Sequence, residues 1–392
     1  MIQYSQESET RIKVLTEGGV CLKITKVEPI MTGWRRMFVK VYTDEGIVGV
    51  GEGGNWGFRE SMVGAVHRME EPLLGQDPLR IEYLNSELYS RFKFGGTSIA
   101  GAISAIDIAL WDIKGKYFNI PIYQMLGGAV RNKIRLWGVV FGKTIDESVA
   151  CAKKLKGEGY TCIRLNPTNI KEATGSYAKR ERAMSDMIHA VREAVGDEVD
   201  IGCEIHRSLQ PHESVRLMQL VEDVNLLFFE DPINYENYQT IQSVARRAMA
   251  PIGVGERSFC IQDVDMLLRE DNISFLRPDV AIMGGITGCK KAAAIAESHY
   301  VNVIPHIATG SICYAASLHL AAAIPNFEVM EMCPAPGEWP KIQQEIKTPF
   351  VIENGYMLLP EGPGLGVELR DDILETAPYH EWRWDLSYNE YK

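Results

Sequence analysis

The sequence predicts an α/β protein made of a (β/α)8-type barrel and an N-terminal α+β capping domain. Two observations favour this fold. From residue 131 onwards, eight short apolar runs alternate with amphipathic segments, and eight parallel strands are the number that closes such a barrel. Before residue 131, strand-like runs come first and helix-like runs follow, which is typical of a separate α+β unit.

Residues 1–20 are polar and are expected to form a tail, and residues 21–130 are expected to form the capping domain. Two apolar runs flank residues 44–46, whose sequence Asp-Glu-Gly predicts a hairpin turn. Helices are predicted at 59–74 and 97–118. The second is apolar on every side, so we expect it to be buried.

The barrel is expected to span residues 131–345. Its predicted strands are 134–140, 161–166, 199–205, 225–232, 251–256, 273–279, 302–307 and 327–332. A long loop at 167–180 follows the second strand, at the barrel end where loops cover active sites. Residues 346–392 contain Gly/Pro turns and short β runs, and are expected to leave the barrel and pack on the capping domain.

Composition excludes several classes of function. The net charge of −11, without a Lys/Arg-rich block, argues against binding to nucleic acids or anionic membranes. The longest apolar stretch, 312–324, is too short and too polar to span a bilayer. Residues 49–54 match G-x-G-x-x-G but follow a hairpin strand, which argues against a dinucleotide site. Eight cysteines without a CxxC pair, and no signal-peptide core, indicate a cytoplasmic protein.

Three glutamates lie at the predicted ends of consecutive strands. Glu204, Glu230 and Glu256 are separated by equal intervals of 26 residues, the length of one βα unit. We therefore expect them to meet at adjacent positions on the rim of the barrel. Three converging carboxylates stay ionised only if a cation joins them. Hard oxygen ligands of this number, with room for substrate and water, predict a Mg²⁺ site.

An acid and a histidine follow on the next two strands. Asp279 and His306 are 27 residues apart, again one βα unit. A carboxylate facing a histidine orients the imidazole and raises its basicity. An isolated pair of this kind is more often a satisfied core histidine with its nearest acid, but beside three metal ligands the catalytic interpretation is favoured.

The order of these motifs resembles a known family. The runs FFEDP, GVGER, RPD, GGIT, PH and MEM, with DEGIVGVGE and AIDIALWDIKGK before them, resemble the mandelate racemase/muconate lactonizing enzyme group of the enolase superfamily. Within that group the chain is most similar to acid-sugar dehydratases of the galactonate dehydratase type. The resemblance covers about residues 22–370.

The resemblance implies a role for each site residue. Glu204, Glu230 and Glu256 would hold Mg²⁺, and the substrate carboxylate would chelate the metal. His306, oriented by Asp279, would be the base that removes the α-proton to give an enediolate. His206 would be the acid that protonates the departing 3-hydroxyl, and Glu331 would hydrogen-bond a substrate carboxylate oxygen.

The chain also departs from that group in two places. Its first ligand is Glu204 where the dehydratases usually have Asp. On the second strand, where racemising relatives carry a catalytic lysine, the sequence has Arg164 followed by Leu165 and Asn166. Arginine is always protonated and is a poor base, so we assign Arg164 and Asn166 to substrate binding. A base on one side only suits elimination rather than racemisation.

Further substrate contacts are expected on the capping domain, at Trp34, Arg35 and Trp56, although ordinary hairpin and turn structure explains these segments equally well. The sequence as a whole predicts a Mg²⁺-dependent hydro-lyase that converts an aldonic acid to its 2-keto-3-deoxy acid. A racemase or epimerase of a hydroxy acid, and a non-catalytic sugar-acid-binding relative, are the alternatives. The resemblance also implies a homo-oligomer.

Overall fold

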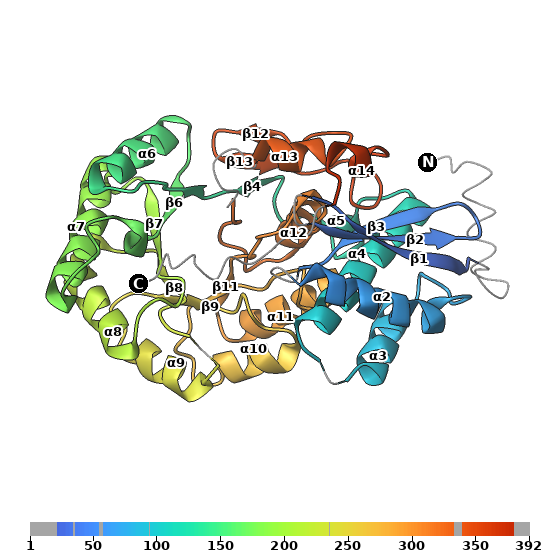
Figure 1. Cartoon of the computed structure of the whole chain (residues 1–392), viewed down its shortest axis with the longest axis horizontal. Coiled ribbons are helices and arrows are strands. Elements are labelled where there is room, and N and C mark those ends of the chain that lie inside the picture. Colours follow the sequence, from blue (N-terminus) through green and yellow to red (C-terminus); the bar gives the residue numbers. More distant parts are fainter. Residues whose placement is uncertain are drawn as a thin grey trace.

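A computed structural model of the chain describes residues 22–33, 36–54, 58–93, 95–234, 236–332 and 339–379. Two bodies lie side by side in Figure 1. One contains a three-stranded antiparallel sheet with helices packed on it, and the other contains a seven-stranded parallel sheet ringed by helices. The predicted tail at residues 1–20 lies outside the described residues.

The N-terminal body contains the predicted hairpin and the predicted buried helix. Its elements are β1 (Ile24–Met31), β2 (Met37–Thr43), β3 (Val48–Glu52), α2 (Arg59–Leu73), α3 (Ile81–Arg91), α4 (Thr97–Phe118) and α5 (Ile122–Met125). Strand β2 pairs antiparallel with both β1 and β3, and the turn at residues 44–46 joins β2 to β3. Helix α4 has the predicted bounds, and most of its residues are buried.

Alternate glycines allow α4 to lie against β3. Gly49, Gly51 and Gly53 occupy alternate positions of the segment that resembles a nucleotide-binding loop. A Cβ atom at Gly49 or Gly51 would lie under 3.0 Å from the carbonyl oxygen of Ala109 or Ala105 in α4. The glycine pattern therefore serves close packing between strand and helix, and not phosphate binding.

The second body is the barrel. Its strands are β5 (Gly138–Val139), β6 (Cys162–Leu165), β7 (Asp200–Glu204), β8 (Phe228–Glu230), β9 (Ile252–Val254), β10 (Phe275–Leu276) and β11 (Asn302–Val303). The strand before them, β4 (Lys133–Arg135), lies in a separate small sheet. Strands β5 to β11 form one parallel sheet in chain order. This order is the one expected when each strand is followed by a helix that returns the chain to the next strand.

The eighth predicted strand, 327–332, is reduced to isolated bridges. Phe327 bridges to Val303 at one edge of the sheet, and Met330 bridges to Leu136 at the other. Segment 327–330 therefore closes the sheet into a barrel with fewer hydrogen bonds than a full strand would form. The predicted fold class is confirmed, and its final strand is weak.

The barrel interior is filled by large side chains from successive strands. The cluster consists of Trp137, Cys162, Phe228, Phe275, Ile304 and Val329. Gly202 in the middle of β7 makes room for it, because a Cβ there would lie under 3.0 Å from the Phe228 ring. The barrel axis is thus a packed core that supports the strand ends above it.

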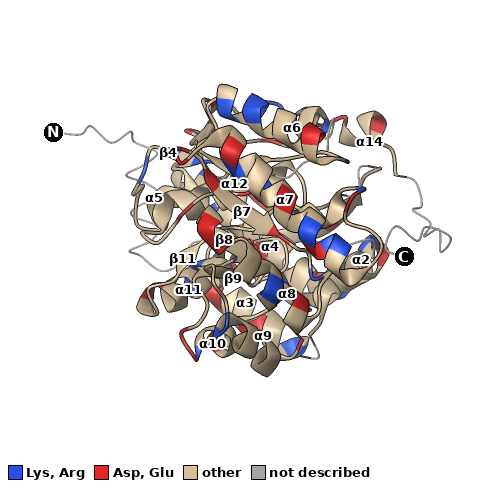
Figure 2. Cartoon of the chain, turned by 90° about the vertical axis from the view of Figure 1, so that its left-hand side faces the viewer, with Lys and Arg blue, Asp and Glu red and all other residues tan. Residues whose placement is uncertain are grey.

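Helices cover the outside of the barrel. They are α6 (Ile145–Gly157), η1 (Pro167–Asn169), α7 (Tyr177–Val195), α8 (Pro211–Leu220), η2 (Glu222–Val224), α9 (Tyr238–Ala245), α10 (Ile261–Leu268), α11 (Gly285–Ser298) and α12 (Ser311–Ala323). Figure 2 shows acidic and basic residues interspersed along α6, α7 and α8. Among the described helices, none has the length and apolarity to cross a membrane.

The C-terminal segment runs back over both bodies. It contains α13 (Trp339–Gln344), β12 (Ile352–Glu353), β13 (Tyr356–Leu358) and α14 (Ile373–Thr376). Strands β12 and β13 form a small antiparallel sheet with β4, the strand that precedes the barrel sheet. The backbone N–H of Leu365 donates to Asp112 of α4 at 2.9 Å, and that of Gly33 donates to the carbonyl of Ala377 at 2.9 Å.

Two buried acids join the N-terminal body to the N-terminus of α12. Glu52, at the end of β3, accepts hydrogen bonds from the backbone N–H groups of Gly310 at 2.6 Å and Cys313 at 3.0 Å. Glu345 accepts from the N–H of Ser311 at 2.8 Å and from Nε of Arg36 at 3.0 Å. Carboxylates are stabilised at this end of a helix because its first N–H groups are unpaired.

This acid pair predicts a pH-dependent stability. Burial, reinforced by the Glu345 charge, raises the pKa of Glu52 from 4.5 to about 7, and burial also raises the pKa of Glu345. The folded chain then binds more protons than the unfolded chain between pH 4.5 and 7. The free energy of unfolding should therefore fall, by an amount on the order of 3 kcal/mol, as the pH rises through that window.

Urea unfolding at a series of pH values measures this effect. The Glu52→Gln variant removes one titrating group and should show a smaller fall in the free energy of unfolding than the wild-type chain. An unchanged pH dependence in that variant would show that the acid pair does not take up the proton.

Candidate active site

The three predicted metal ligands converge at the carboxyl ends of neighbouring strands. Glu204 ends β7, Glu230 ends β8, and the two residues are direct partners in the sheet. Glu256 lies two residues beyond the end of β9. One carboxylate oxygen from each of the three lies within 4.8 Å of the others, and all three side chains are buried.

Each of these carboxylates contacts one arginine. Arg164 Nη1 lies 2.5 Å from Glu204 Oε2, Arg277 forms an ion pair with Glu230, and Arg207 forms one with Glu256. Arg207 also pairs with Asp231, which follows Glu230 directly. Of these partners, the sequence had indicated Arg164 alone.

Acids outnumber bases in this buried cluster. The carboxylates are those of Glu204, Glu230, Asp231, Glu256, Asp279 and Glu331, and the basic groups are those of Arg164, Arg277 and His306, all buried, and of the half-buried Arg207. Such an excess of negative charge in a buried site requires protons or a cation. Burial raises the pKa of Glu230 well above its usual value, and the Glu204 and Glu331 charges raise it further.

The donor set fits a hard divalent cation. Neither carboxylate oxygen of Glu230 accepts a hydrogen bond within the described part of the chain, although the side chain is almost fully buried. The ion pair with Arg277 offsets part of the cost of burying this carboxylate, and a bound cation would offset more of it. Three carboxylate oxygens with no sulfur or nitrogen ligand among them are the ligand type that Mg²⁺ prefers.

Asp279 and His306 form a hydrogen-bonded pair beside the metal-ligand cluster. His306 Nδ1 lies 2.7 Å from Asp279 Oδ2, and the other Asp279 oxygen accepts from the N–H of Ala281 at 2.7 Å. His306 Nε2 lies 3.4 Å from Glu256 Oε2. Burial alone would lower the pKa of His306, but the charges of Glu256, Glu331 and Asp279 outweigh it and raise that pKa to about 10.

Glu331 directly follows segment 327–330, which closes the barrel. Its Oε1 accepts from Arg164 Nη2 at 3.3 Å, and its Oε2 accepts from Arg277 Nη2 at 2.6 Å and from the N–H of Ile307 at 3.0 Å. Burial opposes ionisation of Glu331, but Arg277, His306 and Arg164 outweigh it and lower its pKa. Both oxygens are therefore engaged by protein donors.

His206 does not follow the alternation of β7. The strand ends at Glu204, and His206 and Arg207 adopt left-handed conformations with φ of 49° and 63°. The His206 side chain is exposed, whereas Glu204 is buried. In an extended strand, the side chains of Glu204 and His206 would point to the same face. That alternation does not apply here, since the strand has already ended at Glu204.

The remaining predicted residues differ in their surroundings. Asn166 follows β6, and its Oδ1 accepts from the N–H of Thr168 at 3.0 Å and from the Thr168 hydroxyl at 2.6 Å, so it caps the short helix η1. Trp34, Arg35 and Trp56 lie outside the described residues. Their predicted substrate contacts, like the role of Asn166, stay predictions.

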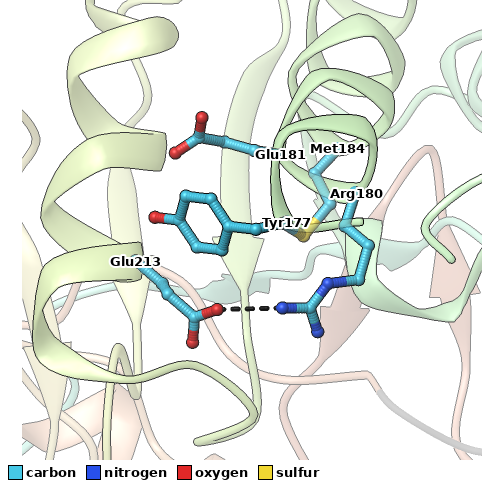
Figure 3. A pocket seen from close by; sticks show the side chains of 5 residues that line it. All are labelled: Tyr177, Arg180, Glu181, Met184 and Glu213. Carbon is cyan, nitrogen blue, oxygen red and sulfur yellow. Dashed lines mark hydrogen bonds and ion pairs between the residues drawn. The ribbon is translucent and has the colours of Figure 1, made fainter. Parts of the chain in front are cut away.

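A surface pocket lies elsewhere, between α7 and α8 (Figure 3). Its lining side chains are those of Tyr177, Arg180, Glu181, Met184 and Glu213. Arg180 and Glu213 pair across it at 3.0 Å. None of these residues belongs to the carboxylate cluster, so we do not assign the pocket to the candidate active site.

Two family models match the chain. Residues 30–127 match the mandelate racemase/muconate lactonizing enzyme N-terminal domain, and residues 147–373 match the enolase C-terminal domain-like model. The chain belongs to the enolase superfamily. The family that the motifs predicted is thereby confirmed, at the level of its mandelate racemase/muconate lactonizing enzyme group.

Relatives in this superfamily match almost the whole chain. The D-galactonate dehydratase of Pectobacterium atrosepticum is 34% identical over 373 residues, covering 92% of this chain and 96% of that protein. The D-galactonate dehydratase of Ralstonia pickettii has the same identity and coverage. These relatives confirm the predicted enzyme class, a hydro-lyase, for this chain.

Solved structures of superfamily members confirm the predicted fold class. An enolase superfamily member from Salmonella Typhimurium superposes with a TM-score of 0.86 at 30% identity, covering 91% of this chain and 98% of that chain. An enolase from Agrobacterium radiobacter, solved with sodium and L-malate bound, has a TM-score of 0.86 at 27% identity, with 93% and 97% coverage.

Proposed function

We propose that the chain is a Mg²⁺-dependent sugar acid dehydratase that converts an aldonic acid to its 2-keto-3-deoxy acid. The observation that carries the proposal is the convergence of Glu204, Glu230 and Glu256 beside the hydrogen-bonded pair of Asp279 and His306. The D-galactonate dehydratases among its relatives support a sugar acid as the substrate class.

The three glutamates would hold Mg²⁺ in this proposal. When bound, the ion would supply a Lewis acid that withdraws charge from the substrate carboxylate. This help is needed because the proton α to a carboxylate is only weakly acidic, and its removal leaves an enediolate that carries additional negative charge.

His306 is the base in this proposal. Asp279 accepts from Nδ1, so Nε2 is the nitrogen that would receive the α-proton. This requires a neutral imidazole, and a cation held by the three glutamates would offset the Glu256 charge that otherwise raises the pKa of His306. Burial excludes bulk water from the imidazole. Arg164 would bind substrate and cannot act as a second base on β6, because a guanidinium does not lose its proton. A single base favours elimination over racemisation.

His206 is the acid in this proposal. Hydroxide is a poor leaving group, so a proton must reach the 3-hydroxyl as its bond to carbon breaks. An exposed imidazole at the end of β7, two residues from Glu204, is open to a substrate that enters from solvent. Homo-oligomeric assembly and a cytoplasmic location stay predictions.

The test is a screen of the purified protein with Mg²⁺ against four- to six-carbon mono- and diacid sugars, with 2-keto-3-deoxy product read by semicarbazide absorbance. We expect turnover of at least one aldonic acid, abolished by EDTA and restored by Mg²⁺. Exchange of the α-proton with solvent deuterium without loss of water would instead indicate a racemase or epimerase. Binding of metal and sugar acid without either reaction would indicate a non-catalytic relative.

A further inference from the structure

We propose that Arg277 is a positioning residue that fixes Glu230 for metal binding and aligns Glu331 with it, and that Trp137 in turn fixes Arg277. This inference rests on the metal site of the proposed function and adds to it a residue to which the sequence analysis assigned no role. Arg277 lies just beyond β10, two residues before Asp279.

Arg277 connects two carboxylates from strands on different sides of the barrel. Its Nε forms the ion pair with Glu230 at the end of β8, and its Nη2 donates to Glu331 Oε2 at 2.6 Å. The side chain is only 1% exposed. The planar guanidinium therefore sets the separation and orientation of the two carboxylates, which lie 101 positions apart in the sequence (331 − 230).

Trp137 holds the guanidinium from one side. The Arg277 Cζ atom lies 4.7 Å from the centroid of the Trp137 ring, and the Arg164 Cζ atom lies 5.8 Å from it. Trp137 is fully buried and packs on Phe228 with ring centroids 5.4 Å apart. The indole thus supports both arginines that reach Glu331, by a cation–π contact that a desolvated site strengthens.

A purely structural ion pair is the competing explanation. Buried ion pairs often contribute little net stability, because desolvation offsets the attraction between the charges. If Arg277 only balances charge, lysine should replace it without a loss of metal affinity. A residue that sets geometry would not, since lysine offers one point charge in place of a planar fork. The two explanations therefore differ in what Arg277→Lys does to metal affinity.

Mn²⁺ binding, measured by titration calorimetry or by the EPR signal of the free ion, tests the proposal without depending on turnover. We expect Arg277→Lys and Arg277→Gln to raise the Mn²⁺ dissociation constant about 10- to 100-fold, the range for groups that orient metal ligands. Arg192→Lys is the matched control. Arg192 lies near the end of α7 and donates to main-chain carbonyls, among them those of Val199 and Val224.

A second variant covers the case in which the arginine variants do not fold. Trp137→Phe keeps an aromatic ring that can pack on Phe228 of β8, but it replaces the indole under Arg277 and Arg164 with a smaller ring that makes a weaker cation–π contact. We expect a several-fold weaker affinity with a native circular dichroism spectrum.

The outcomes separate this proposal from the one that it rests on. Wild-type protein that binds no Mn²⁺ would overturn the metal site itself. Wild-type protein that binds Mn²⁺, with an Arg277→Lys variant whose affinity is unchanged, would overturn the positioning role alone. If the Arg277 variants do not fold, a Trp137→Phe variant that binds Mn²⁺ as tightly as the wild-type protein would also overturn the positioning role.

Discussion

Replacing His306 by asparagine should lower kcat by a factor of about 10² to 10⁴, the usual contribution of a general base. Asparagine can still donate to Asp279 from a similar position, but it has no basic nitrogen to take the α-proton. Substrate binding should persist, because His306 is not one of the predicted metal ligands. The measurement is the rate of 2-keto-3-deoxy acid formation at saturating Mg²⁺ and substrate.

His206→Asn separates the two proton transfers. In that variant the base is intact, so we expect dehydration to be lost while the α-proton still exchanges with solvent deuterium. In His306→Asn both dehydration and exchange should be lost. Full dehydratase activity in either variant would refute the role assigned to that histidine.

A second His–Asp pair supplies a matched control for the His306 variant. His299 Nδ1 lies 2.6 Å from Asp271 Oδ1, in the segment that follows α11 and away from the carboxylate cluster. His299→Asn should leave kcat unchanged. A loss of activity there equal to that of His306→Asn would mean that the asparagine substitutions act through stability rather than chemistry.

The convergence of the carboxylates could be predicted because it depends on topology. Parallel strands joined by helices place their carboxyl ends on one rim, so equal intervals in the sequence become neighbouring positions in space. Glu204 and Glu230 are accordingly direct sheet partners. The same regularity brought Asp279 and His306 together.

The arginines could not be predicted in the same way, because their partners come from strands that are distant in sequence. Arg277 reaches Glu331 only because segment 327–330 closes the barrel. A charged residue inside the apolar run FLRPD was nevertheless a usable signal, since an arginine that is buried requires an acidic partner.

The direction of the His206 side chain could not be predicted from the alternation of side chains along a strand. Alternation predicts a side-chain direction only while the chain remains extended, and the left-handed φ values at His206 and Arg207 end that regularity. Non-glycine residues adopt such values through tertiary contacts, here including the hydrogen bond from the N–H of Arg207 to the carbonyl of Asp231 at 3.0 Å. Nothing in the local sequence indicates them.

Glu230→Gln should have the largest effect on metal binding. Glu230 is the most deeply buried of the three predicted ligands, and neither of its oxygens accepts a hydrogen bond within the described residues. Glutamine keeps the shape of the side chain but removes the charge that a divalent cation needs. We expect the Mn²⁺ dissociation constant to rise by more than about 100-fold, beyond the range for groups that only orient a ligand, and dehydratase activity to be lost with it.

Glu328→Gln is the control for this variant. Glu328 is a half-buried acid in the segment that closes the barrel, and it accepts from Asn302 Nδ2 at 2.7 Å, three residues away from Glu331. Its replacement should leave Mn²⁺ affinity unchanged. Glu230→Gln should also lose more Mn²⁺ affinity than Arg277→Lys. The first variant removes a metal ligand, whereas the second removes only the side chain that positions it. The reverse order would mean that the cation binds elsewhere in the cluster, with Glu230 serving as a partner for Arg277.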